Sequence, residues 1–139
     1  MKPDNDITRF LDAQDTEWSM YDEALREVRR GRKSSHWIWY IFPQLRGLGH
    51  SRNSTYYGIA DRREAEEYLH HPVLGARLRE ITLALLEHTD AAAVEIFGGI
   101  DARKVHSCMT LFDSISPDDI FARVLDQFYG GRRDPRSIV

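Results

Sequence analysis

Apolar residues recur at helical spacing along most of this 139-residue chain, and they lie between residues that commonly start or end helices. Leu74, Leu78, Ile81 and Leu85 form one such stripe, because positions three and four residues apart share a helix face. A chain of this length is most simply one domain, in which several helices bury their apolar stripes against one another. The pattern predicts an all-α fold, a compact single-domain multihelical bundle that spans residues 1–139.

Start and stop residues give approximate bounds for the helices. Asp61 with Glu64 resembles a capping box, Pro72 suits the first position of a helix, and Ser116 before Pro117 predicts an N-cap. The expected helices cover residues 7–14, 15 or 16 to 30, 61–69, 72 onward, 89 or 90 to 98, 101 onward and 116–130. Residues 36–42 are rich in aromatic and β-branched side chains, so this segment stays open between helix and strand.

The expected helix that ends at residue 30 carries Trp18, Tyr21, Leu25 and Val28 on one face, and Gly31 ends it. Two later segments lack a helical pattern. Three glycines indicate a long Gly-containing loop between residues 43 and 60, of the kind that often carries function. Residues 130–139 begin with two glycines, and we expect them to form a mobile tail.

Charges are segregated along the chain. Residues 28–60 contain six Arg or Lys residues and neither Asp nor Glu, whereas the whole chain has a net charge of −3, which leaves −9 for the other residues. Six aromatic residues are interleaved with these cations. Such a segment attracts anions, and aromatic faces beside cationic groups suit a planar ligand that carries phosphate.

The candidate ligand-binding residues lie in this basic segment and on one later helix. If Ser35 caps a helix, free backbone N–H groups would join Lys33 and His36 in an anion nest. Trp37 would stack on a planar group, or it would belong to the core with the basic residues as a solvated turn. Lys104 lies at the edge of an apolar arc and would either complete a phosphate site or extend to solvent. The full candidate set is Arg32, Lys33, Ser35, His36, Trp37, Trp39, Arg46, His50 and Lys104.

No sequence motif identifies a reaction. The chain lacks the glycine-rich phosphate loops, the H-E-x-x-H and C-x-x-C metal patterns and the G-x-S-x-G elbow. Catalytic residues and turnover are therefore undetermined, and neither a metal nor a cofactor is predicted. Glu95 and Asp101 are the first carboxylates to suspect of general-base work, although helix capping explains both. Cys108 is more typical of a buried apolar residue than of a nucleophile.

Composition narrows the expected location and partners. The longest apolar run has six residues, far below the ~18 of a membrane span, and the N-terminus lacks a secretory pattern. A single cysteine suits a reducing compartment, so we expect a cytoplasmic protein without a membrane partner. The sequence pI near 6.1 argues against a dedicated nucleic-acid-binding protein, which usually carries a basic surplus.

Four long segments of the chain are distinctive. They are GRKSSHWIWYIFPQLRGLGHS at residues 31–51, YLHHPVLGARL at 68–78, EIFGGIDARKVHSCMTLF at 95–112 and FYGGRRDPR at 128–136. These segments resemble a bacterial family catalogued as domain of unknown function 1810. The resemblance implies an all-helical fold, and it brings no established activity, substrate, cofactor or catalytic residue.

The sequence therefore predicts a protein that binds a small phosphate-containing ligand, such as a nucleotide or a nucleotide-derived metabolite. One alternative is a protein-interaction or regulatory module whose exposed aromatic loop docks a partner. Another is a protein that binds single-stranded nucleic acid by stacking. A concave pocket with convergent donors would favour the first hypothesis, and a flat apolar patch would favour a protein partner.

Overall fold

The computed structural model describes residues 2–16 and 19–139, and within these ranges the chain is helical and contains no strand. The all-α prediction is confirmed. The helices are α1 (Thr8–Gln14), α2 (Met20–Arg30), α3 (Ile38–Ile41), α4 (Arg52–Tyr56), α5 (Arg62–His70), α6 (Leu74–Leu86), α7 (Ala93–Phe97), α8 (Gly99–Ile115), α9 (Ile120–Tyr129) and a 3-10 helix η1 (Pro135–Ser137).

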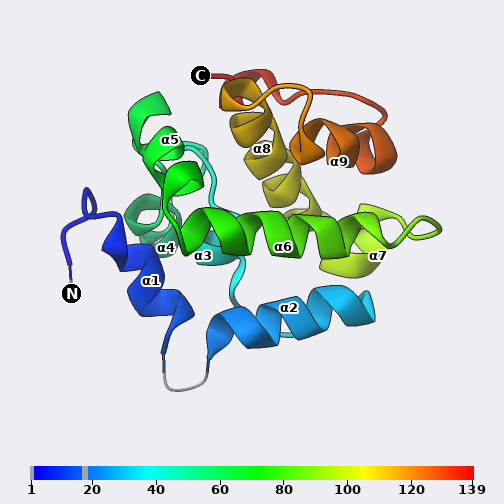
Figure 1. The fold of residues 1–139 in the computed structure, drawn as a ribbon, viewed down its shortest axis with the longest axis horizontal. Helices are drawn as coiled ribbons and strands as arrows, with labels where there is room; N and C mark the ends of the chain where they lie inside the picture. Colours follow the sequence, from blue (N-terminus) through cyan, green and yellow to red (C-terminus); the bar gives the residue numbers. More distant parts are fainter. Residues whose placement is uncertain (1, 17–18) are drawn as a thin grey trace.

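Helix α6 lies at the centre of the bundle (Figure 1) and packs against α2, α5 and α9. The longest helix, α8, packs against α5, α7 and α9. The predicted stripe of α6 faces this core, since Leu74, Leu78, Ile81 and Leu85 are all buried. One continuous apolar core therefore joins helices from both halves of the chain, as expected for a single domain.

One of these four predicted helix starts is correct in mechanism, and three are displaced. Asp61 caps α5, because its side chain accepts the Glu64 N–H at 2.9 Å. Helix α8 starts at Gly99, which leaves the predicted opener Asp101 in the first turn. Helix α7 starts at Ala93 rather than at residue 89 or 90. Helix α6 starts after Pro72, since His71 Nδ1 accepts the N–H groups of residues 73 and 74 and fixes a turn there.

The prediction that Ser116 caps the last helix is wrong. Helix α9 starts at Ile120, and its N-cap is Asp119, whose side chain accepts the Ile120 N–H at 2.7 Å. Asp118 has a positive φ of 58°, so the chain between Ser116 and Asp119 turns instead of continuing as a helix. The Ser116 hydroxyl donates to the Asp119 carboxylate at 2.7 Å and steadies that turn.

Helix α2 begins later than predicted. Trp18, which we assigned to its apolar stripe, lies outside the described residues. The rest of the stripe is buried in the core, and Gly31 ends the helix in the left-handed conformation with φ of 84°, as predicted. Residues 36–42, open between helix and strand, form the single turn α3.

The long loop between residues 43 and 60 is more compact than predicted. It contains the short helix α4, and its two ends are paired: the Arg46 N–H donates to the Ile59 carbonyl, and the Ile59 N–H donates to the Gln44 carbonyl, both at 2.8 Å. These bonds form an isolated parallel bridge between Leu45 and Ile59. The loop therefore folds back on itself and separates its basic residues from the earlier part of the basic segment.

The C-terminal segment packs against α8. Asp134 accepts the Ser107 hydroxyl at 2.9 Å, and its own N–H donates to Thr110 at 3.0 Å. Arg133 pairs with Asp113 at 3.1 Å, and Ser137 is fully buried. Residues 130–139, for which the sequence predicts a mobile tail, therefore make several polar contacts with α8.

Candidate anion-binding cleft

The backbone N–H groups that the sequence assigned to an anion nest bind a carboxylate of the protein itself. Glu27, fully buried on α2, accepts the N–H groups of Ser34 and Ser35 at 2.6 and 2.9 Å. It also accepts the Ser35 hydroxyl at 2.6 Å and the Trp37 indole N–H at 3.0 Å. The nest exists, but its anion is internal.

This bonding keeps Glu27 ionised. Burial raises the pKa of Glu27, but the hydrogen bonds from Ser35 and Ser34 outweigh burial and lower the pKa to about 2. Trp37 is 0% exposed and belongs to the core, so the core alternative holds for this residue. Ser35 and Trp37 therefore hold an internal carboxylate, and neither lines the cleft described next.

The next part of the basic segment forms one wall of a cleft of about 400 Å³. The opposite wall comes from the junction of α7 and α8. The structure brings four candidate residues together here: Lys33, His36, Trp39 and Lys104. The remaining lining residues are Ile38, Phe97, Gly98, Gly99, Ile100 and Asp101.

Two lysines in the cleft converge on one carboxylate. Lys33 Nζ lies 2.8 Å from Asp101 Oδ2, and Lys104 Nζ lies 3.4 Å from Asp101 Oδ1. Each ammonium also lies over an indole ring, Lys33 over Trp37 at 5.0 Å and Lys104 over Trp39 at 5.1 Å. Lys104 does not simply extend to solvent, since its side chain is only 23% exposed.

Backbone donors border the same cleft at the start of α8. Gly98 caps the helix with φ of 79°, a conformation that favours glycine. By helix geometry, the N–H groups of the first turn, at Gly99 and Ile100, have no intrahelical acceptor. A Cβ added at Gly98 or Gly99 would meet no atom within 4 Å, so the backbone is open to a ligand on this side.

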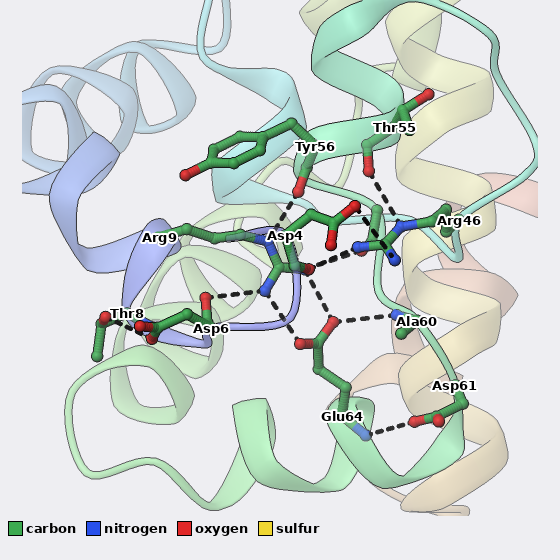
Figure 2. Close-up of polar contacts among 11 residues, drawn as sticks. Asp4, Asp6, Thr8, Arg9, Arg46, Thr55, Tyr56, Ala60, Asp61 and Glu64 are labelled. Carbon is green, nitrogen blue, oxygen red and sulfur yellow. Dashed lines mark hydrogen bonds and ion pairs between the residues drawn. The ribbon is translucent and has the colours of Figure 1, made fainter. Parts of the chain in front are cut away.

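Two other candidate residues, Arg46 and His50, lie elsewhere. The Arg46 guanidinium donates to the carbonyls of Asp4, Thr55 and Gly58 at 2.6, 3.0 and 3.1 Å, so its N–H groups are used within the fold (Figure 2). His50 is exposed and lines a separate hollow near α4. The single pocket predicted from the sequence is therefore divided, because the loop between residues 43 and 60 folds back on itself.

The exposed side chain of Arg32 does not line the cleft. Its backbone N–H donates to the Glu27 carbonyl at 3.0 Å and completes the end of α2.

Sequence reasoning missed a buried ion pair beside Arg46. Arg9, 1% exposed, bonds both oxygens of Glu64 at 2.8 and 3.0 Å and shares the Gly58 carbonyl with Arg46 (Figure 2). The Arg9 guanidinium also binds the carbonyl of Asp6, so the pair joins the N-terminal segment to the loop and α5. No local signal reveals this pair, because its members are 55 residues apart.

Other residues considered for chemistry have structural roles. The Glu95 side chain accepts the Ala92 N–H at 2.9 Å and caps α7. Cys108 is fully buried, and burial raises the pKa of its thiol well above the usual range, which leaves little reactive thiolate. Across residues 2–16 and 19–139, no group of three His, Cys, Asp or Glu residues could hold a metal ion. Over those same positions, none of the helices combines the length and the hydropathy needed to cross a bilayer.

Comparisons with known proteins give a family and a fold. The family model described as "Protein of unknown function (DUF1810)" matches residues 4–139. The crystal structure of the conserved hypothetical protein Rv1873 from Mycobacterium tuberculosis is similar to this chain, with a TM-score of 0.91 and 41% sequence identity. The match covers 96% of this chain and 94% of that chain. No curated protein matches the chain.

Proposed function

The chain belongs to the DUF1810 family, and from the geometry of its cleft we propose that it binds a small phosphate-containing ligand, of the nucleotide or nucleotide-derived kind. The observation that carries the proposal is the convergence of Lys33 and Lys104 beside the first turn of α8. Two ammonium groups and free backbone N–H groups on one cleft are a combination that suits a phosphate. The single cysteine favours the cytoplasm as the place of this binding.

Apolar side chains in the cleft support a ligand that has an organic part besides its anion. Ile100 is 66% exposed although it is aliphatic, and Phe97 and Ile38 line the same cleft. A cleft of this size with apolar walls and few polar groups is typical of small-molecule sites. Lys104 covers a face of Trp39, so we expect a ring to contact Ile100 and Phe97 rather than to stack on the indole.

The alternative of an exposed aromatic loop has less support. Tyr57 packs edge-on against Tyr40 and Tyr56, with ring centroids 5.3 and 4.8 Å apart, and all three side chains are partly buried. These rings fill space within the loop instead of forming a flat apolar patch. A groove for single-stranded nucleic acid is equally disfavoured, since the cations of the basic segment lie in separate places.

The test is to measure, by thermal shift and calorimetry, whether the protein binds nucleoside mono- and diphosphates and ADP-ribose-type compounds. A ligand at 100 times its Kd stabilises the folded state by about 2.7 kcal/mol, which is readily measured. We expect Lys104→Met to lose most of this stabilisation, because Met keeps the apolar stem and removes the ammonium.

The matched control is Arg103→Met, which removes one positive charge from an exposed neighbour on the same helix. It should bind like the wild-type protein. A protein that none of these compounds stabilises would contradict the proposal, and equal losses in the two variants would move the site away from the cleft.

A further inference from the structure

We propose that Asp101 makes the cleft select singly charged phosphodiesters over doubly charged phosphate monoesters. This inference rests on the proposed function, because it concerns the same cleft, and it adds the charge class of the ligand.

The fixed charges in the cleft give the reason. Lys33 and Lys104 contribute two positive charges, and Asp101 contributes one negative charge between them, at 2.8 and 3.4 Å. The lysine and aspartate side chains are 9%, 23% and 18% exposed, so water screens these charges only in part. The three groups together leave one positive charge, which one negative charge on a ligand balances.

Asp101 is held in place by its position as well as by the two lysines. It lies in the first turn of α8, where the helix dipole stabilises a negative charge. An anion that contacts both ammonium groups therefore also lies close to the Asp101 carboxylate. The second charge of a phosphate monoester meets this carboxylate without a further cation to balance it, and like charges in one site repel strongly.

The backbone N–H groups at the start of α8 do not favour the monoester over the diester, so they do not compensate for this repulsion. The N–H groups of Gly99 and Ile100 bind a phosphate oxygen in a diester as readily as in a monoester. His36 lies on the exposed rim of the cleft, where solvent screens its electrostatic effect on a bound anion. Asp101 is thus the group that distinguishes the two ligand classes, because its carboxylate repels the second negative charge of a phosphate monoester.

The test compares each of the four common nucleoside 5′-monophosphates with its phosphate methyl ester by calorimetry at pH 8. The two members of a pair share base, sugar and linkage, but the monoester carries nearly two negative charges at this pH because its second pKa is about 6. We expect the wild-type protein to bind at least one methyl ester about tenfold or more tightly than the parent monoester. Asp101→Asn should remove or reverse this preference by strengthening monoester binding.

Glu67→Gln is the matched control, since it removes one negative charge from an exposed residue on α5. It should keep the preference of the wild-type protein. If the wild-type protein binds compounds of this set but no methyl ester more tightly than its parent monoester, or if Asp101→Asn strengthens binding of both members of a pair equally, the charge selection is wrong and phosphate binding stands. If none of the eight compounds binds, the charge selection fails, and the proposed function is decided separately by the nucleoside diphosphates and ADP-ribose-type compounds named above. The wild-type comparison is decisive by itself, so the inference is tested even if Asp101→Asn does not fold.

Discussion

The carboxylate of Glu27 accepts the indole N–H of Trp37 at 3.0 Å, and both residues are 0% exposed. This bond joins α2 to the segment that leads into α3. The bond is possible because the chain reverses at Gly31, so that residues 34–37 lie alongside α2. The same reversal places Lys33 in the cleft.

The first prediction concerns acid stability. The pKa of Glu27 is about 2 in the folded protein and near 4.5 without the fold, so folding favours the ionised form. Its contribution is complete above about pH 4.5 and is lost as the pH falls towards 2. The full loss is on the order of 3 kcal/mol.

Urea unfolding between pH 2 and 7 measures this loss. The free energy of unfolding of Glu27→Gln should fall less over this pH range than that of the wild-type protein. Parallel curves for the two proteins would contradict the role of Glu27.

A second prediction distinguishes the two candidate caps of α9. Asp119 caps the helix and also pairs with Arg79 through both oxygens, at 3.0 and 3.1 Å. Asp119→Ala should therefore reduce the free energy of unfolding by about 1–2 kcal/mol. Ser116→Ala removes only one hydrogen bond to Asp119 and should cost less than about 1 kcal/mol. Chemical denaturation of both variants measures the two losses of unfolding free energy. A larger loss for Ser116→Ala than for Asp119→Ala would favour Ser116 as the cap of α9, as predicted from the sequence.

The Arg9–Glu64 pair provides a third prediction. Arg9→Met leaves the Glu64 carboxylate buried without its cation, which should cost about 3–5 kcal/mol of stability. Arg9→Lys should recover little, because an ammonium cannot reproduce the two-oxygen contact of a guanidinium. Arg63→Met, at an exposed position on α5, serves as the control and should change the denaturation midpoint little. If Arg9→Met unfolded at the same denaturant concentration as this control, the pair would be of no consequence for stability.

A fourth prediction separates stability from binding at the start of α8. Gly98→Ala should destabilise the protein by about 1 kcal/mol or more, because alanine is strained at a positive φ. Gly99→Ala should leave stability unchanged or raised, since this residue is helical and a Cβ meets no atom within 4 Å. The added methyl group would instead stand between the ligand and the N–H groups of the first turn. Thermal unfolding with and without ligand checks both effects, and unaltered ligand affinity in Gly99→Ala would exclude these N–H groups from binding.

Local signals in the sequence predicted much of the fold. The Leu74 to Leu85 stripe, the Asp61 cap and the Gly31 stop depend on residues within a few positions of one another, and the structure contains all three. The predicted starts of α6 and α9 were misplaced. The start of α6 depends on the hydrogen bonds that the His71 ring accepts, and the start of α9 depends on the positive φ of Asp118. Residue propensities indicate neither feature.

The candidate site was predicted less completely, for two physical reasons. Charge segregation indicated Lys33 and His36, and both line the cleft. It could not show that a carboxylate of the same chain, Glu27, accepts the backbone N–H groups expected to bind a ligand. Arg46 was separated from them by loop pairing that no local pattern indicates. Lys104 lines the cleft and pairs with Asp101, which lies three residues earlier on the same helix.

Lys33 connects both walls of the cleft at once. Its backbone N–H donates to the Ile96 carbonyl at 2.7 Å, and its ammonium pairs with Asp101 on α8. The conformational entropy of this lysine is therefore lost when the chain folds rather than when a ligand arrives. A cleft that is already assembled needs no slow rearrangement before association, so the rate of encounter, rather than a change of shape, sets how fast it fills.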